Sequence, residues 1–214
     1  MTVSSFGFQG QKCSACSRVI VDEKVYEKFV DLLRKRAESI TVGQAKDLNN
    51  YMGPVINKKS MDNIRRYIEK GIQEGGRLVA GGGTSQTAGS GYFLRPTVIA
   101  DVDPKATIAQ EEIFGPVLAV IKARNFDHAL EIANNTEFGL TGAVYSRNKK
   151  KLKTAKTEFF CGNLYLNRKC TGAMVGAHPF GGFNMSGTDS KAGGQDYLLL
   201  FLQAKSVATK VRGI

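Results

Sequence analysis

At 214 residues, the chain is long enough for one domain with a continuous core, and its 42% hydrophobic and 23% charged residues exclude wholesale disorder and collagen-like architectures. The net charge of +11, from 30 Lys and Arg against 19 Asp and Glu, raises nucleic-acid binding, because basic surfaces attract phosphate. The basic residues are spread along expected helices, as at Lys24, Lys28 and Arg34, without a recognition motif. We therefore expect no nucleic-acid partner.

The first half of the chain alternates between strand and helix patterns. Residues 18–21 form a short apolar run typical of a buried strand, and residues 23–40 carry apolar side chains at helical spacing. Asn57 is a suitable N-cap for a second helix, which is expected to stop at Gly75 and Gly76. A strand at 77–80, a glycine-rich loop at 81–91 and extended structure at 92–102 follow.

The second half continues this alternation. Strands are expected at 117–121, 142–145 and 163–166, and helices at 126–134 and 149–159. Strands that alternate with helices usually form a parallel sheet that is covered on both faces. The chain is therefore predicted to be an α/β protein, a three-layer αβα domain with a mainly parallel sheet. The active site of such a sheet lies in the loops beyond the C-terminal ends of the strands.

The last part of the chain has a different pattern. Residues 196–207 include five consecutive apolar residues, Leu198 to Leu202, and predict a late strand. A strand of this kind is an exposed edge when it stands alone, so it is expected to dock on another chain or on a missing segment. We therefore expect a catalytic domain at 1–195 and a C-terminal oligomerisation arm at 196–214.

No targeting or membrane segment is recognisable in the sequence. The longest apolar patch, residues 197–202, is about a third of the roughly 20 residues that a membrane-spanning helix needs. Residues 1–10 also lack a basic stretch followed by an apolar one, which a secretion signal requires. The expectation is a cytoplasmic protein without a membrane partner.

Four cysteines in a chain of this size are too few for a disulfide framework, so reduced thiols are expected. Cys13 and Cys16 have the CxxC spacing of zinc and redox sites. No second CxxC or His pair accompanies them, and His128 and His178 lie far apart in the sequence. The pattern predicts no metal site and leaves redox activity as a minor alternative.

Cys13 lies in a glycine-punctuated segment just before the first expected strand. Glycine lets the backbone approach a ligand closely, and a thiol becomes nucleophilic when nearby amides or positive charge favour the thiolate. Lys12 is adjacent in sequence. On the residues alone, such a cysteine is more often structural than catalytic.

Three motifs favour a catalytic role for Cys13 over a structural one. They are Gly-Gln-Lys-Cys-Ser-Ala at 10–15, Glu-Glu-Ile-Phe-Gly-Pro-Val at 111–117, and Pro-Phe-Gly-Gly at 179–182 followed by Ser-Gly at 186–187. In this order and spacing they resemble the signatures of the aldehyde dehydrogenase family, and the resemblance covers nearly the whole chain. It implies that Cys13 is the catalytic nucleophile of an oxidoreductase.

Within that family, residues 6–18, 162–167 and 171–173 are similar to the 1-pyrroline-5-carboxylate dehydrogenases. The resemblance implies glutamate 5-semialdehyde, or a related small aldehyde, as the substrate. The residues implicated in binding it are Ser14, Gly172, Ala173 and Phe180. Some relatives have serine where this chain has Ala173, so any contact here is through the backbone amide. Phe180 would pack on the aliphatic chain of the substrate.

The resemblance also implies a mechanism and a cofactor. Cys13 would attack the aldehyde, and the resulting thiohemiacetal would lose hydride to give a thioester that water hydrolyses. Glu112 would bind the ribose hydroxyls of NAD, with NADP as the alternative, and Phe114 would pack near the nicotinamide. Without the resemblance, Glu112 is explained as a solvated loop acid, Phe114 and Phe180 as core aromatics, and Gly172 as a turn residue.

Family members are more than twice as long as this chain, and their cofactor domain precedes the cysteine. No G-x-G-x-x-G motif follows a strand in this sequence. The cofactor-binding domain is therefore expected to be absent, NAD binding by this chain alone is doubtful, and the isolated chain is expected to be inactive. The expected partner is the missing N-terminal half or further copies in a homo-oligomer. The alternative is a non-catalytic oligomerisation or assembly fragment.

Overall fold

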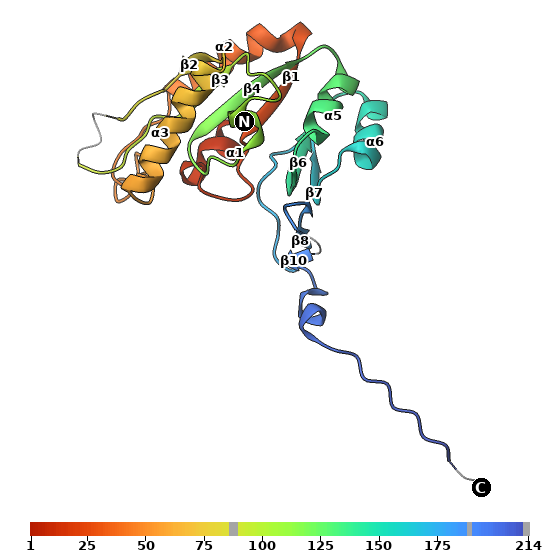
Figure 1. The fold of residues 1–214 in the computed structure, drawn as a ribbon. Helices are drawn as coiled ribbons and strands as arrows, with labels where there is room; N and C mark the ends of the chain where they lie inside the picture. Colours follow the sequence, from red (N-terminus) through yellow and green to blue (C-terminus); the bar gives the residue numbers. More distant parts are fainter. Residues whose placement is uncertain (86–89, 188–189, 212–214) are drawn as a thin grey trace.

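The computed structural model describes residues 1–85, 90–187 and 190–211 and centres on a four-stranded sheet (Figure 1). The order of strands is β1-β4-β3-β2, with β1 at Arg18–Asp22, β4 at Val117–Ala123, β3 at Thr97–Ala100 and β2 at Arg77–Ala80. The β1–β4 and β4–β3 pairs are parallel, and β2 is antiparallel to β3. The prediction of an α/β fold with a mainly parallel sheet is confirmed.

Strand β4 is central because its residues are apolar on both sides. Val117, Ala119 and Ile121 belong to the core on one face of the sheet, whereas Leu118 and Val120 belong to the core on the other face. Successive side chains of a strand point to opposite faces, so an unbroken apolar run requires cover on both. Burial of all five side chains shows that β4 has this cover.

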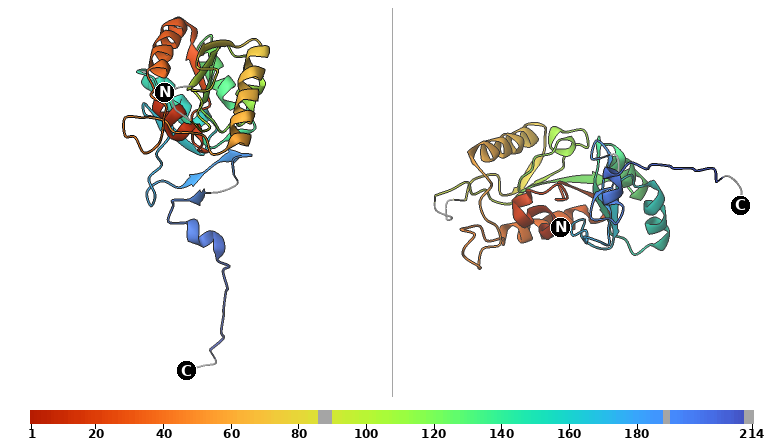
Figure 2. Two further views of the ribbon diagram at one scale, coloured as in Figure 1. Left: turned by 90° about the vertical axis from the view of Figure 1, so that its left-hand side faces the viewer. Right: turned by 90° about the horizontal axis from the view of Figure 1, so that it is seen from below.

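Helices supply that cover (Figure 2). On one face lies α2 (Tyr26–Glu38), after the short turn η2 (Glu23–Val25), and it buries Tyr26 and Leu33. On the opposite face lie α3 (Lys58–Gln73) and α5 (Phe126–Asn134), which bury Ile64 and Ile132. The arrangement is the three-layer αβα architecture that the sequence predicts.

A second, smaller set of strands lies beyond β1. The parallel pair of β6 (Thr141–Val144) and β7 (Asn163–Leu166) is connected by α6 (Lys149–Glu158). Two short antiparallel pairs complete it: β5 (Phe138–Gly139) with β9 (Phe183–Asn184), and β8 (Phe180–Gly181) with β10 (Ser190–Ala192). Among the described residues, β1 pairs only with β4 and β6 pairs only with β7.

The structure contains short elements that periodicity does not reveal. They are α1 (Thr2–Phe6), the 3-10 turn η1 (Gly7–Gly10) and α4 (Thr107–Gln110). Elsewhere the boundaries of the expected strands and helices agree with the structure to within a few residues. The Asn57 side chain accepts a hydrogen bond from the Ser60 N–H at 2.8 Å, so the predicted N-cap of α3 is confirmed.

The tail differs from the expected strand over 196–207. Tyr197–Phe201 forms a 3-10 turn, η4, and residues 202–211 run away from the body without pairing to any described strand (Figure 1). A strand forms only when its backbone groups find a partner, and within the described part of this chain none lies beside the tail. The side chains of Leu198 to Leu202 are exposed as a result.

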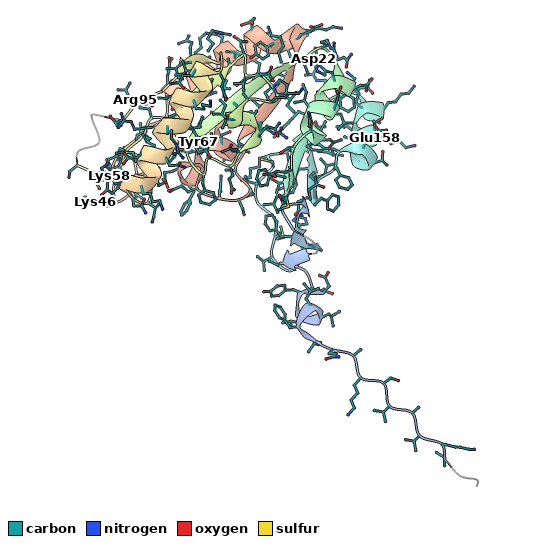
Figure 3. The ribbon with its side chains drawn as sticks, viewed as in Figure 1. Asp22, Lys46, Lys58, Tyr67, Arg95 and Glu158 are labelled. Atoms are coloured by element: carbon teal, nitrogen blue, oxygen red, sulfur yellow. The ribbon has the colours of Figure 1, made fainter. Side chains whose placement is uncertain are left out.

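Charged side chains lie at the periphery, and Lys58 and Glu158 are on opposite sides of the main body (Figure 3). The ion pairs of Arg34 with Asp31 and Glu38 are exposed on α2, where such pairs contribute little to stability. Over the described residues, no helix is both long and apolar enough to cross a membrane.

Candidate active site

Cys13 lies at the tip of a tight turn between η1 and β1. The Ala15 N–H donates to the Lys12 carbonyl at 3.0 Å, which closes the turn and leaves the Cys13 thiol exposed. Just before it, Phe8 and Gln9 both have a φ of 56°, a left-handed conformation that is uncommon for residues with a side chain. The segment is therefore shaped by its surroundings rather than by local propensity.

One close backbone contact holds this segment in place. Gly10 is buried with a φ of 67°, and a Cβ on it would lie 2.3 Å from the Gly115 carbonyl oxygen. Only glycine allows these two backbone segments to approach so closely. The contact brings the Cys13 loop against the segment that carries Glu112 and Phe114, although about a hundred residues separate them.

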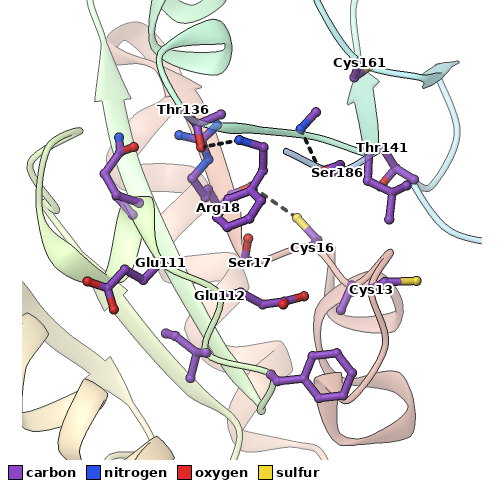
Figure 4. A pocket seen from close by; sticks show the side chains of 18 of the residues that line it. Cys13, Cys16, Ser17, Arg18, Glu111, Glu112, Thr136, Thr141, Cys161 and Ser186 are labelled. Atoms are coloured by element: carbon purple, nitrogen blue, oxygen red, sulfur yellow. Dashed lines mark hydrogen bonds between the residues drawn. The ribbon is translucent and has the colours of Figure 1, made fainter. Parts of the chain in front are cut away.

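Cys13, Glu112 and Phe114 line one cavity of about 330 Å³ (Figure 4). The carboxylate of Glu112 points toward the Cys13 loop, while the thiol of Cys13 points away from it. The wall beyond them is formed by Thr136, Thr141 and Ser186. The structure thus brings together three of the residues that the motifs single out.

The two adjacent acids have different environments. Glu111 accepts a hydrogen bond from the Tyr67 hydroxyl of α3 at 2.6 Å, and this bond raises the pKa of Tyr67. The side chain of Glu112 is exposed and has no hydrogen-bond partner among the described residues. Anchoring of Glu111 fixes the segment and leaves the carboxylate of Glu112 available to a ligand.

Phe114 supplies an aromatic face at the same site. Its φ is 56° and its side chain is 46% exposed. An aromatic ring in a cavity wall normally buries its surface against a partner. The exposed ring of Phe114 is therefore suited to pack on a flat group that enters the cavity.

Lys12 supplies positive charge behind the Cys13 turn. Its Nζ donates to the Ser4 carbonyl at 3.0 Å, near the end of α1, and desolvation lowers the pKa of its amine. The cation interacts electrostatically with Cys13, Cys16 and Cys170. Positive charge near a thiol favours the thiolate.

Cys16 and Cys170 form a buried thiol pair beside the Cys13 turn. The Cys16 thiol donates to the Arg18 carbonyl at 3.2 Å, and the interaction between the two thiols raises the pKa of Cys16 and lowers that of Cys170 to about 6. The Cys170 sulfur also lies 3.7 Å from the Ser14 carbonyl oxygen. The pair connects the Cys13 turn to the loop that contains Gly172, whose carbonyl accepts a hydrogen bond from Arg168 at 3.1 Å.

The expected substrate-binding residues lie near this cavity but do not line it. Ser14 follows Cys13 in the turn, and the Gly172–Ala173 loop is connected to it through Cys170. Phe180 lies farther along, in β8. These residues are not part of the wall that Cys13, Glu112 and Phe114 share. The described residues also contain no group of three or more His, Cys, Asp or Glu that could hold a metal ion.

Sequence reasoning missed Arg18. Its guanidinium lies in the same cavity wall, where Nη2 donates to the Ala133 carbonyl at 3.0 Å and desolvation lowers its pKa. Its Nη1 is buried without a hydrogen-bond partner among the described residues. A buried donor of this kind is costly unless a partner satisfies it. Nothing in the sequence separates Arg18 from an ordinary strand residue, because its environment depends on the distant helix α5.

The cysteine turn, the facing acid and the exposed ring line one cavity of an α/β domain. The aldehyde dehydrogenase family matches residues 1–207. This chain belongs to the aldehyde dehydrogenase family.

The relatives that this chain resembles have names that are more specific than that of the family. The chain is 58% identical over 206 residues to 1-pyrroline-5-carboxylate dehydrogenase 1 of Halalkalibacterium halodurans, covering 96% of this chain and 39% of the relative. The crystal structure of the Thermus 1-pyrroline-5-carboxylate dehydrogenase with bound NAD is similar, with a TM-score of 0.90 and 53% identity, over 94% of this chain and 38% of that chain. The lactaldehyde dehydrogenase of Escherichia coli has a TM-score of 0.88 and 31% identity, over 96% and 42%. The chain thus spans about two fifths of the length of these relatives.

Proposed function

We propose that this chain is the catalytic portion of a 1-pyrroline-5-carboxylate dehydrogenase, which oxidises glutamate 5-semialdehyde to glutamate with NAD. The observation that carries the proposal is the shared cavity of Cys13, Glu112 and Phe114. The relatives' names support the substrate class, and the Thermus structure with bound NAD supports the cofactor. NADP is the alternative cofactor, and a related small aldehyde is the alternative substrate.

In this proposal Cys13 is the nucleophile. Its thiolate adds to the aldehyde carbon and forms a thiohemiacetal, and the backbone N–H of Cys13 stabilises the oxyanion, a contribution of about 3 kcal/mol in comparable sites. Loss of hydride from this carbon leaves a thioester on the sulfur. Water then releases the carboxylic acid and restores the thiol. Bound NAD supplies the hydride acceptor.

The donor set of the cavity fits one end of NAD. Glu112 offers an unpaired carboxylate for the ribose hydroxyls, and Phe114 offers an exposed ring for the nicotinamide. No G-x-G-x-x-G pattern, which would place backbone amides around a pyrophosphate, follows a strand in this sequence. We therefore propose that Glu112 and Phe114 hold only the nicotinamide riboside end, so that the isolated chain binds NAD weakly and turns over little substrate.

Substrate anchoring is assigned to the Gly172 side of the site. The loop of Gly172 and Ala173 is held beside Ser14 by the Cys170 contact, and Phe180 lies on the next strand of the same segment. In the proposal, Ser14, Gly172 and Ala173 bind the carboxylate and amino groups of the substrate, and Phe180 packs on its aliphatic chain. Ala173 makes its contact through the backbone amide, because it has no polar side chain.

A fusion of this chain to the unmatched portion of the Halalkalibacterium relative tests the proposal. Glutamate semialdehyde and NAD should give NADH with the fusion, and Cys13→Ser should reduce the rate to background. Cys161→Ser is the matched control, because Cys161 lines the same cavity but is buried, and burial raises its pKa to about 11. Equal losses in the two variants, or NADH production by the Cys13→Ser protein, would contradict the assignment of the nucleophile.

A second candidate function is assembly through the arm at 196–214. Its support is the exposure of five consecutive apolar side chains, Leu198 to Leu202, on a segment that projects from the body (Figure 1). Light scattering separates the possibilities: a homo-oligomer that Leu200→Lys dissociates supports this function. A Lys205→Glu variant is the control for charge alone, and an unchanged mass in Leu200→Lys would count against the arm.

A further inference from the structure

The CxxC pattern of Cys13 and Cys16 does not act as a pair in the proposed chemistry. Cys13 is exposed whereas Cys16 is buried. The two residues belong to one tight turn, but their sulfurs point in different directions (Figure 4). The structure therefore gives Cys16 a partner other than the one that the sequence spacing suggests.

That partner is Cys170, which lies far along the chain in the loop after β7. The Cys16 and Cys170 side chains are both buried, and the two thiols interact directly. The Cys170 sulfur also lies 3.7 Å from the Ser14 carbonyl oxygen, and the Cys16 thiol donates to the Arg18 carbonyl at 3.2 Å. Both sulfurs are thus held against the backbone of the same short segment, residues 14–18.

The surroundings of the pair favour reaction at one of the two sulfurs. The interaction with Cys16 and, more weakly, the charge of Lys12 lower the pKa of Cys170 to about 6. The interaction with Cys170 and desolvation raise the pKa of Cys16. The thiolate, not the thiol, is the nucleophile toward oxidants and disulfides. Near neutral pH, Cys170 is therefore the reactive sulfur and Cys16 retains its proton.

A second cavity, of about 720 Å³, gives small molecules access to the pair. It lies between β1 and β6, and Cys16 and Cys170 both line it. A molecule close to the size of water needs only roughly 30 Å³, so hydrogen peroxide fits with room to spare. Cys13 is not part of the described wall of this cavity. A small oxidant therefore reaches the pair from a side that the exposed nucleophile does not share.

We propose that Cys16 and Cys170 form a modification site, at which a peroxide produces a reversible disulfide between the Cys13 turn and the Gly172 loop. The Cys170 thiolate attacks a peroxide oxygen: an S–O bond forms, the O–O bond breaks, and the hydroxide that leaves takes a proton from solvent. The Cys16 sulfur then attacks that of Cys170: the S–S bond forms, the S–O bond breaks, and the second hydroxide leaves with the Cys16 proton. The pair loses two electrons, and the peroxide becomes two waters.

This proposal does not depend on aldehyde oxidation, because neither sulfur takes part in that reaction. The bond nevertheless joins the two segments to which substrate binding is assigned. Ser14 lies two residues before Cys16, and Gly172 lies two residues after Cys170. Oxidation replaces the non-covalent contacts between these segments with a covalent bond, and a dithiol removes it again by two exchange steps.

Peptide mapping of the oxidised chain tests the proposal. The whole chain is treated with about one equivalent of hydrogen peroxide, its remaining thiols are alkylated, and it is digested with trypsin without reductant. The cysteines then fall in three peptides: residues 13–18 with Cys13 and Cys16, residues 157–168 with Cys161, and residues 170–191 with Cys170. We expect peptide 13–18 to be linked to peptide 170–191 within one chain, and dithiothreitol to separate them.

Cys13→Ser identifies which cysteine of peptide 13–18 is linked. This variant changes an exposed residue, and the link should form in it at a rate within about twofold of the unchanged chain. Cys161→Ser is the matched control at a buried thiol whose pKa burial raises to about 11, and it should also keep the link. No linked peptide, a link that Cys13→Ser abolishes, a bond between the two cysteines of peptide 13–18, or a link only between separate chains would each overturn the proposal.

Discussion

Gly10→Ala is the substitution that most directly tests how the Cys13 loop is held. The new Cβ would lie 2.3 Å from the Gly115 carbonyl oxygen and 3.0 Å from that of Ser5, so backbone would have to move. A left-handed φ costs a residue with a side chain about 1–2 kcal/mol, and overpacking costs about 1–3 kcal/mol more. The free energy of unfolding should fall by about 2–5 kcal/mol.

Gly75→Ala is the matched control. Gly75 also has a positive φ, 96°, but a Cβ on it would meet nothing within 4 Å. It should therefore cost only the conformational part, about 1–2 kcal/mol. Urea denaturation measures both values, and the alkylation rate of Cys13 reports on the loop. Equal losses of stability, with an unchanged rate at Cys13, would refute the close contact between Gly10 and Gly115.

Three further predictions concern single interactions. Asn57→Ala should lower the free energy of unfolding by about 1 kcal/mol in urea, because the Ser60 N–H loses its cap. Tyr26→Phe should lower it by about 1–3 kcal/mol in the same assay, because the Asp101 N–H donates to the Tyr26 hydroxyl at 2.7 Å and would be left unpaired. Folding lowers the pKa of Cys170 to about 6, so the unfolded state holds more protons between about pH 6 and the ordinary thiol pKa of 9.0. Stability should therefore rise with pH through this window and fall as pH drops through about 6, and urea midpoints of Cys170→Ala should show a flatter dependence.

The larger elements of the fold were predictable because their signals are local. Asn57 and Gly75 mark the two ends of α3, and the apolar residues between them repeat at helical spacing. The unbroken run of β4 indicates a strand buried on both faces, which is its place in the sheet. In both cases the residues that determine the structure lie inside the element or directly beside it.

The elements that escaped prediction depend on distant contacts. Helices α1 and α4 have five and four residues and no side-chain cap, so packing rather than propensity holds them. The tail shows the opposite error, since the apolar run of Leu198 to Leu202 has strand character but finds no partner. A strand needs a neighbouring strand to pair with, and the apolar pattern of one segment does not show whether that neighbour is present.

The same distinction between local signals and distant contacts applies to the site. The resemblance to a family indicated that Cys13, Glu112 and Phe114 act together, and the cavity places them together. Periodicity could not have done so, because the contact of Gly10 with Gly115 spans more than a hundred residues. The roles assigned to Ser14, Gly172, Ala173 and Phe180 stay predictions, since these residues lie outside that cavity wall.

The catalytic cavity shares part of its wall with a second cavity that lies between β1 and β6. Ala15, Cys16, Ser17 and Arg18 line both of them. In that shared wall the Nη1 of Arg18 is buried without a hydrogen-bond partner among the described residues. Arg18 begins the strand that follows the Cys13 turn, so the bond from its Nη2 to the Ala133 carbonyl connects that turn to α5. The position of the nucleophile therefore depends on contacts between distant segments, which no local sequence pattern reveals.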